Sequence, residues 1–265
     1  IINGQLSTLT GQIIDYERTR TYSGNGVNIP FELNNPEDIV CLCLRPADWD
    51  KKFILSRDID MAFIDGYRPI ENFVGSIDGQ GHVIRNLVVD AALLANSNSL
   101  GLICRLSENG LIMNLGIENV QVIGGEYARC LGGLCGENYR GTIRGCYIAG
   151  IVSGGEFASF LGGLCGSNYR GTIHSCYTTV IINGSDSSVS LGGLCGNNTE
   201  GTVFNCYAVG RISGGSIDVG GLYGNNSGFN NNCFWDIQTT ETINGVGNVG
   251  IQGKTTSEMQ LSSTF

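Results

Sequence analysis

The sequence predicts an all-β fold, a parallel β-helix built from three-strand coils of about 30 residues. The first observation is a block that recurs at a fixed spacing. The second is that each copy contains three short β-prone runs separated by Gly and Asn. The third is composition, since the 265 residues include 41 Gly and only 4 Pro, and 15% are charged. Such a mixture suits many short strands joined by tight polar turns and disfavours helical bundles.

The repeat is defined by the segment LGGLCG, which recurs every 30 residues, at 131–136, 161–166 and 191–196. Each copy precedes a second block, NYRGTIRGCY, NYRGTIHSCY or NTEGTVFNCY, which starts at Asn138, Asn168 and Asn198. Degenerate copies start at Ser99 and Val219. Atypical end copies are expected because the ends of a stack must be capped.

The β-prone runs of one copy are GGLCG, GTIRGCYIA and IVSGG. A unit of this size cannot bury its own apolar face, so the copies must stack, with equivalent residues about 4.8 Å apart. A leucine-rich repeat has a similar period, but its Leu-x-x-Leu-x-Leu pattern is absent. A propeller blade needs about 40 residues or more.

The pattern LGGLCGxNxxGTIxxCY resembles the GLUG repeat of bacterial secreted and cell-surface proteins. The segments that start at Pro36 and Tyr67 resemble the opening of such proteins, and CFWDIQTT at Cys233 resembles their closing segment. The resemblance runs from about Thr21 to Gln260. It implies a right-handed β-helix on an exported bacterial protein, often part of something larger, and it implies no single activity.

Four segments follow from the repeats and the resemblance. We expect an N-terminal extension over residues 1–20, an opening cap with the first coils over 21–98, the GLUG-type coils over 99–232 and a closing cap over 233–265. Only the extension lies outside the resemblance, which makes it a candidate for a role that the repeats do not share.

Charge and hydropathy exclude two classes of partner. With 24 acidic and 15 basic residues, the formal charge of -9 repels nucleic acid and anionic membrane surfaces. No run approaches the roughly 18 apolar residues that span a bilayer, so we expect no membrane insertion. Because the chain begins with Ile1, we expect a processed mature chain or an excised fragment. The resemblance implies a location outside the cell or on its surface.

Most of the 11 cysteines obey the repeat and form two ladders, Cys135, Cys165 and Cys195 in one, and Cys146, Cys176 and Cys206 in the other. One interpretation is a column of free, buried thiols that act as small apolar residues. The alternative is a disulfide across each corner, joining 135 to 146, 165 to 176 and 195 to 206. Zinc is a weak alternative because there is no CxxC and there are only two histidines.

An aromatic and basic strip is the candidate surface for a polysaccharide or cell-surface glycan. Tyr139 and Arg140 recur as Tyr169 and Arg170, and His174 follows in the next strand. Rings can stack on a sugar and guanidinium groups can form forked hydrogen bonds. The same residues could equally pack a turn. Nearby, Asn138 and its equivalents are expected to stack at a corner.

Acidic residues also recur, in the turn before each GGLC strand, as Glu126, Glu156 and Asp186. Stacked carboxylates repel one another unless a cation intervenes, so calcium is one hypothesis for a cofactor. The alternative is a solvated acidic edge.

Glycosylation sequons are frequent, as expected for a chain rich in Asn and Ser on a surface protein. The candidate acceptors are Asn183, Asn197 and Asn225.

Self-association is the remaining candidate role for the first residues, because an apolar, uncharged segment could add as a strand to a neighbouring copy and propagate a fibre. The candidate residues are Ile1, Ile2, Leu6, Leu9, Ile13 and Ile14. The alternative is a strand docked on its own helix.

Two functions remain open. The first is a non-catalytic extracellular module that is structural, adhesive or fibre-forming and that binds glycans. The second is a polysaccharide lyase or glycoside hydrolase for acidic glycans, which would need a general base and a charge neutraliser. Its candidate residues would be Arg140, Arg170, His174, Glu126 and Glu156. These residues obey the repeat, whereas a catalytic site normally interrupts it, and His82 is read as part of a turn. We therefore favour the non-catalytic function, with no catalytic residue assigned.

Overall fold

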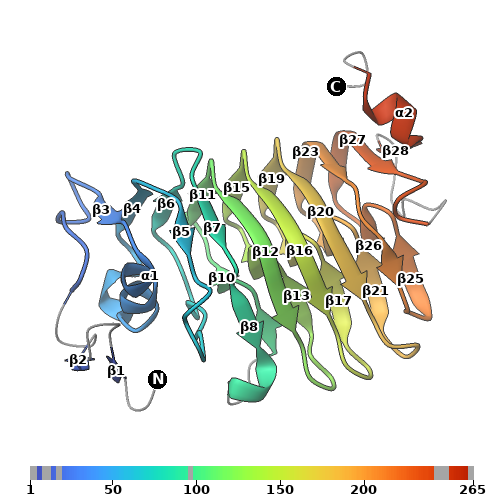
Figure 1. Cartoon of the computed structure of the whole chain (residues 1–265). Coiled ribbons are helices and arrows are strands. Elements are labelled where there is room, and N and C mark those ends of the chain that lie inside the picture. Colours follow the sequence, from blue (N-terminus) through green and yellow to red (C-terminus); the bar gives the residue numbers. More distant parts are fainter. Residues whose placement is uncertain (1–4, 8–12, 16–19, 95–97, 242–250, 262–265) are drawn as a thin grey trace.

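The computed structural model describes residues 5–7, 13–15, 20–94, 98–241 and 251–261, and its core is a parallel β-solenoid of about five turns (Figure 1). Successive copies of the repeat lie in register. Leu131 pairs with Leu161, and Leu161 pairs with Leu191. The fold class, the coil length of about 30 residues and the use of three sheets are confirmed.

Two of the three sheets have five parallel strands each. Sheet 1 contains β10 (Ile103–Leu106), β14 (Cys135–Tyr139), β18 (Cys165–Tyr169), β22 (Cys195–Thr199) and β26 (Tyr223–Asn226). Sheet 2 contains β9 (Ser99–Leu100), β13 (Cys130–Gly132), β17 (Ser159–Gly162), β21 (Val189–Gly192) and β25 (Ile217–Gly220).

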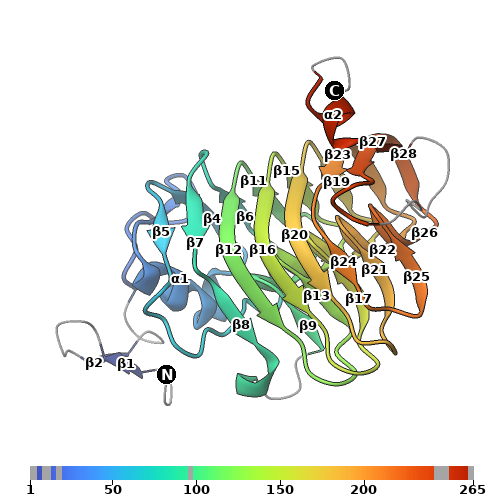
Figure 2. The same ribbon diagram turned by 45° about the vertical axis from the view of Figure 1, so that its right-hand side comes forward.

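Sheet 3 is larger, with 16 strands, because each coil crosses it on both sides of a bend. Figure 2 shows its strands β7, β12, β16 and β20 side by side. Its members are β3 (Phe31–Leu33), β4 (Lys52–Leu55), β5 (Ile59–Asp60), β6 (Ser76–Asp78), β7 (Val83–Arg85), β8 (Val88–Asp90), β11 (Leu111–Met113), β12 (Gly116–Ile123), β15 (Thr142–Arg144), β16 (Tyr147–Ser153), β19 (Thr172–His174), β20 (Tyr177–Asn183), β23 (Thr202–Ala208), β24 (Ile212–Ser213), β27 (Phe229–Asp236) and β28 (Ile251–Lys254).

The strand boundaries differ from the predicted runs at two corners. The run GGLCG is not one strand, because β13 ends at Gly132 and β14 starts at Cys135. The run GTIRGCYIA is interrupted at Gly145, where φ is 60°. Ser175 and Asn205 have the same left-handed backbone in the next coils, since the bend in sheet 3 requires it.

The N-terminal end of the solenoid is covered by α1 (Pro36–Cys43), which is followed by η1 (Pro46–Asp48) (Figure 1). Asn35 caps α1, because its side chain accepts a hydrogen bond from the Asp38 amide, 2.9 Å away. The apolar face of the helix buries Ile39, Val40 and Leu42 against the core. A further short turn, η2 (Ala91–Leu93), follows β8.

At the other end, β28 pairs with β27, and α2 (Thr256–Met259) projects beyond the sheets in both views (Figures 1 and 2). A capping box formed by Thr255 and Glu258 begins α2. At the N-terminus, β1 (Gln5–Ser7) and β2 (Ile13–Asp15) form a separate antiparallel pair.

The core contains columns of identical residues, here called ladders, that run along the solenoid axis with one residue from each coil. The cysteines of the two predicted ladders are buried and form no disulfide. Of the other five, Cys41, Cys43 and Cys233 are buried and Cys104 and Cys130 are partly exposed, and these also form no disulfide. The corner disulfides are therefore the wrong alternative. The in-register stack places neighbouring thiols side by side along the axis instead, with 3.5 Å between the sulfurs of Cys135 and Cys165.

An asparagine ladder runs beside the thiols, as the sequence predicts. The amide Nδ2 of Asn138 donates to Oδ1 of Asn168, and that of Asn168 donates to Oδ1 of Asn198, each over 2.8 Å. Asn198 donates in the same way to Asn226. The first three are fully buried, so each amide satisfies its neighbour where water cannot.

Candidate functional site

The predicted aromatic and basic strip lies at the edge of sheet 1, where β14 and β18 end. The rings of Tyr139 and Tyr169 stack with their centroids 5.5 Å apart and their planes 15° apart. The Arg105 guanidinium covers the other face of Tyr139 at 4.2 Å, and Arg170 lies 5.1 Å from Tyr169. Arg140 and Arg170 occupy the left-handed corner positions.

This geometry limits what the strip can bind. Both faces of Tyr139 are occupied, because the rings stack along the solenoid axis, so its edge and hydroxyl remain for a ligand. The Arg170 guanidinium also pairs with Glu200 over 2.7 Å, and that of Arg140 approaches Glu108 at 3.5 Å. Contact with a glycan through hydroxyl and guanidinium groups stays a prediction. A sugar cannot stack on Tyr139, because neither face of its ring is free.

His174 is separated from the other four strip residues by the corner, because it lies on β19 of sheet 3. Its ring stacks on Phe204 with a centroid distance of 4.8 Å and an angle of 4°. Burial lowers the pKa of His174, and the positive charge of Arg144 lowers it further. His174 is therefore neutral at pH 7 and does not extend the positive charge of the strip.

A second aromatic ladder on the outer face of sheet 3 was missed by the sequence reasoning. Tyr147, Tyr177 and Tyr207 stack with centroid distances of 5.1 and 5.0 Å. In the preceding coil Gly116 takes the equivalent place, and the ring of Tyr147 lies over it. The signal was present in the sequence, since CY recurs in each second block.

The Tyr147 end of this ladder meets a polar network. The Tyr147 hydroxyl donates to Glu118 over 2.7 Å, and Glu118 accepts from Arg85 over 2.9 Å. Arg85 also bonds Asp58 over 2.8 Å, and Asp58 lies 3.2 Å from Nδ1 of His82. The groups satisfy one another on an open face, so the network links four successive coils, those of β5, β7, β12 and β16. His82 thus lies in the expected turn but pairs with a residue 24 positions earlier.

The recurring acidic residues Glu126, Glu156 and Asp186 are all exposed in their turns. Nowhere in the described ranges do three His, Cys, Asp or Glu side chains converge to hold a metal ion. The described residues therefore offer no set of ligands that supports the calcium hypothesis. The exposure of the three carboxylates agrees with the alternative of a solvated acidic edge.

Of the three sequon residues, Asn225 is exposed at the end of sheet 1, whereas Asn183 and Asn197 are half-buried. Asn183 accepts a hydrogen bond from Ser213, and Asn197 bonds Thr199. Asn225 is thus the most accessible candidate for a glycan.

The assembly candidates are only partly within the structure. Ile1, Ile2 and Leu9 lie outside the described residues. Leu6 pairs with Ile14 across the two strands of the β1–β2 pair, and Ile13 pairs with Ser7. The two described strands of this segment therefore pair with each other and join none of the solenoid sheets.

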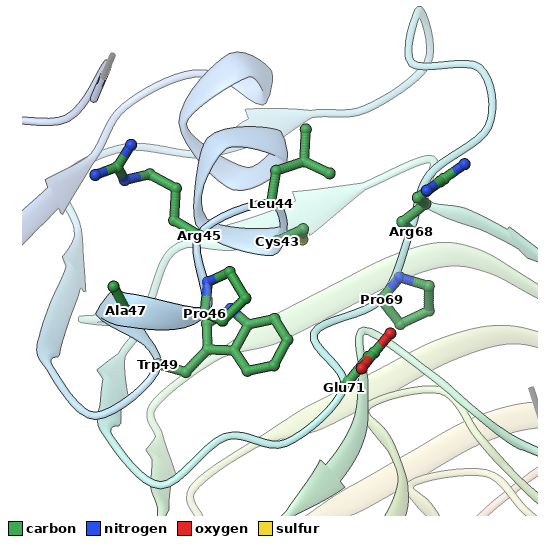
Figure 3. A pocket seen from close by; sticks show the side chains of 9 residues that line it. All are labelled: Cys43, Leu44, Arg45, Pro46, Ala47, Trp49, Arg68, Pro69 and Glu71. Atoms are coloured by element: carbon green, nitrogen blue, oxygen red, sulfur yellow. The ribbon is translucent and has the colours of Figure 1, made fainter. Parts of the chain in front are cut away.

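A cavity of about 480 Å³ lies beside the end of α1, in the part of the chain that does not repeat (Figure 3). One wall comes from the α1–η1 connection, with Cys43, Pro46 and Trp49, and the other from Arg68 to Glu71. Burial raises the pKa of the Cys43 thiol to about 12, so this sulfur is not a nucleophile at neutral pH. The sequence did not reveal this cavity, because its walls are about 20 residues apart.

These features define the class of protein, a parallel β-solenoid of GLUG-type repeats with ladders on its outer faces. A profile of the GLUG motif matches residues 187–213. Over 173 residues, 57% of this chain, the sequence is 32% identical to halomucin of Haloquadratum walsbyi, of which the match covers 2%. None of the described helices is long and apolar enough to cross a membrane.

The fold also resembles a solved structure from Bacteroides ovatus, described as a candidate immunoglobulin A1 protease. The TM-score is 0.61 at 20% sequence identity, and the similarity covers 91% of this chain and 88% of the other. At this identity the likeness concerns the fold alone.

Proposed function

We propose that the chain is a rigid, non-catalytic module of an extracellular or cell-surface protein, in which the solenoid acts as a stiff spacer that displays its outer faces. The observation that carries this proposal is the unbroken axial stacking. Sheet 1 is continuous from β10 to β26, and leucine, thiol and amide ladders run beside its hydrogen bonds. The similarity to 2% of a far longer protein is what a module within a large chain would produce.

Stiffness is the property to measure. Asp50 and Asp218 are exposed and lie near opposite ends of the solenoid. Spectroscopic labels attached there through unnatural amino acids would report the distribution of end-to-end distances and would leave the buried thiols unmodified. We expect one narrow distance that does not change with ionic strength. A broad or two-peaked distribution would contradict the spacer function.

Glycan-directed catalysis is the competing function. Its candidate residues are divided among the edge of sheet 1, the face of sheet 3 and the turns before the strands of sheet 2, which speaks against one active site. We expect no unsaturated product, followed by absorbance, when the protein is incubated with uronate polymers. Turnover that His174→Ala or Arg170→Ala abolishes, and that Arg211→Ala leaves intact, would refute the non-catalytic proposal.

Self-association is a second proposed property, supported by the apolar composition of the first residues. Negative-stain images of the whole chain are expected to contain filaments that a chain lacking residues 1–19 does not form. The cut falls before Arg20, which contacts Asp48 of the cap. Filaments that survive the deletion would exclude a strand-donating role for this segment.

A further inference from the structure

The cavity beside α1 has the composition of a binding site and is independent of the repeat ladders (Figure 3). Its volume of about 480 Å³ falls within the range of about 300 to 1,000 Å³ that small-molecule sites occupy. Its walls come from segments whose backbones are fixed by the core, since Ile39 and Ile70, which flank them, are buried.

Trp49 provides a rigid aromatic surface in this cavity. Its Nε1–H donates to the carbonyl of Leu42 over 2.9 Å, which fixes the orientation of the indole. The side chain remains half-buried and lines the cavity, with Pro46 beside it. Figure 3 shows Pro69 and Glu71 on the opposite wall. Unlike the stacked tyrosines of sheet 1, Trp49 has no stacking partner among the described rings.

Two charged side chains on the opposite wall have no hydrogen-bond partner in the described part of the chain. Arg68 and Glu71 are exposed, and within the described part of the chain neither forms a hydrogen bond or an ion pair. Arg45 also lines the cavity, but its guanidinium turns away and bonds Asp48 over 3.0 Å. One donor group and one acceptor group are therefore available to a ligand, and their charges cancel.

We infer that this cavity binds a neutral sugar residue of a polysaccharide. The indole of Trp49 and the exposed ring of Pro46 pack against the apolar C–H face of the pyranose. The Glu71 carboxylate accepts hydrogen bonds from sugar hydroxyls, and the Arg68 guanidinium donates to a hydroxyl or ring oxygen. A uronate is disfavoured, because its carboxylate would approach Glu71 in a chain whose formal charge is -9.

Trp49 itself reports on the ligand. The chain has two tryptophans, and Trp235 is buried near the opposite end, so Trp235→Phe leaves Trp49 as the sole indole emitter. Titration of this variant with neutral oligosaccharides of glucose, galactose or mannose is expected to shift the Trp49 emission for at least one of them. Calorimetry on the unmodified chain should give the same affinity. Oligogalacturonides serve as the acidic comparison and are expected to bind more weakly.

Two exposed positions test the contacts without threatening the fold. Glu71→Gln and Arg68→Ala are each expected to weaken the binding roughly tenfold, because each removes a charge-assisted hydrogen bond. The matched control is Arg211→Ala, an exposed arginine beside β24 that pairs with Glu241 and belongs to neither the strip nor the cavity, and it should leave the affinity unchanged.

Three results would overturn the inference. These are the absence of binding by every neutral oligosaccharide, tighter binding of oligogalacturonides, and a loss of affinity in Arg211→Ala that matches the loss in the cavity variants. Because the cavity lies outside the repeats, each of these results would leave the proposed spacer function unaffected.

Discussion

At the scale of single residues, the side chains of the buried asparagine ladder hydrogen-bond equivalent side chains of neighbouring coils instead of water. Asn168 is fully buried, and its side chain donates to Asn198 and to the carbonyl of Gly171 while it accepts from Asn138. An amide can serve in such a column because it offers a donor and an acceptor on opposite sides. Every coil therefore depends on its neighbours for the hydrogen bonds of its own corner.

The substitution Asn168→Ala tests this dependence. It leaves Nδ2 of Asn138 and Oδ1 of Asn198 without their partner, so we expect the free energy of unfolding to fall by about 3 kcal/mol. Denaturant titration measures the change. The control is Asn197→Ala, since Asn197 is half-buried and bonds only Thr199 nearby, and it should cost less than about 1 kcal/mol. Equal losses in the two variants would argue against a special role for the ladder.

The thiol ladder makes a second residue-scale prediction. Burial raises the pKa of Cys146, Cys165 and Cys176, so these thiols stay protonated and unreactive. A thiol reagent at pH 8 should label the native chain very slowly and should count 11 thiols after denaturation without reductant. Cys233 is the exception among the buried thiols, because its hydrogen bond with Cys206 lowers its pKa to about 7 in the folded chain. A count below 11 would mean that disulfides are present.

At the scale of elements, one buried carboxylate in η1 connects the cap formed by α1 and η1 to the preceding segment at Arg20 and Tyr22. Asp48 is fully buried and accepts hydrogen bonds from Arg20, Tyr22 and Arg45. Burial by itself would raise the pKa of Asp48, but these hydrogen bonds outweigh it and hold the pKa at about 2. The cap therefore has a pH dependence of its own.

Because the folded pKa lies below the ordinary value of 3.8, the stabilisation is present above about pH 4 and is lost as the pH falls toward 2. It corresponds to about 2 kcal/mol. We expect Asp48→Asn to destabilise the chain at pH 7 and to flatten the acid limb of its stability curve. Asp50→Asn, an exposed neighbour, should change neither. If the stability of Asp48→Asn still fell between pH 4 and pH 2 as it does in the unmodified chain, groups other than Asp48 would cause the loss of stability in acid.

At the scale of the whole molecule, the coils from β9 to β26 are joined without a break, because sheets 1 and 2 each continue through five strands. A stack of coils is stabilised by nearest-neighbour contacts, so its cooperativity depends on the weakest junction. The cap at one end and β27 with β28 at the other close the stack. We therefore expect the solenoid to unfold as one unit.

The two tryptophans allow a test of this cooperativity, because Trp49 lies in the cap and Trp235 near the opposite end. Single-tryptophan variants, Trp49→Phe and Trp235→Phe, should each give a fluorescence transition that coincides with the loss of the far-ultraviolet circular dichroism of the same variant. A fluorescence midpoint that differs from the circular dichroism midpoint would reveal that one end unfolds separately.

The sequence by itself determined the period, the stacking of equivalent residues and the identity of the core ladders. A repeat of 30 residues forces residue i beside residue i+30, as with Tyr139 and Tyr169. Only the tertiary structure decided the rest. It placed His174 on sheet 3 and Arg170 at the edge of sheet 1, left the thiols without disulfides, and brought Trp49 opposite Glu71. The physical reason is that the period sets neighbours along the axis, whereas contacts around a coil and across its caps depend on where the chain bends.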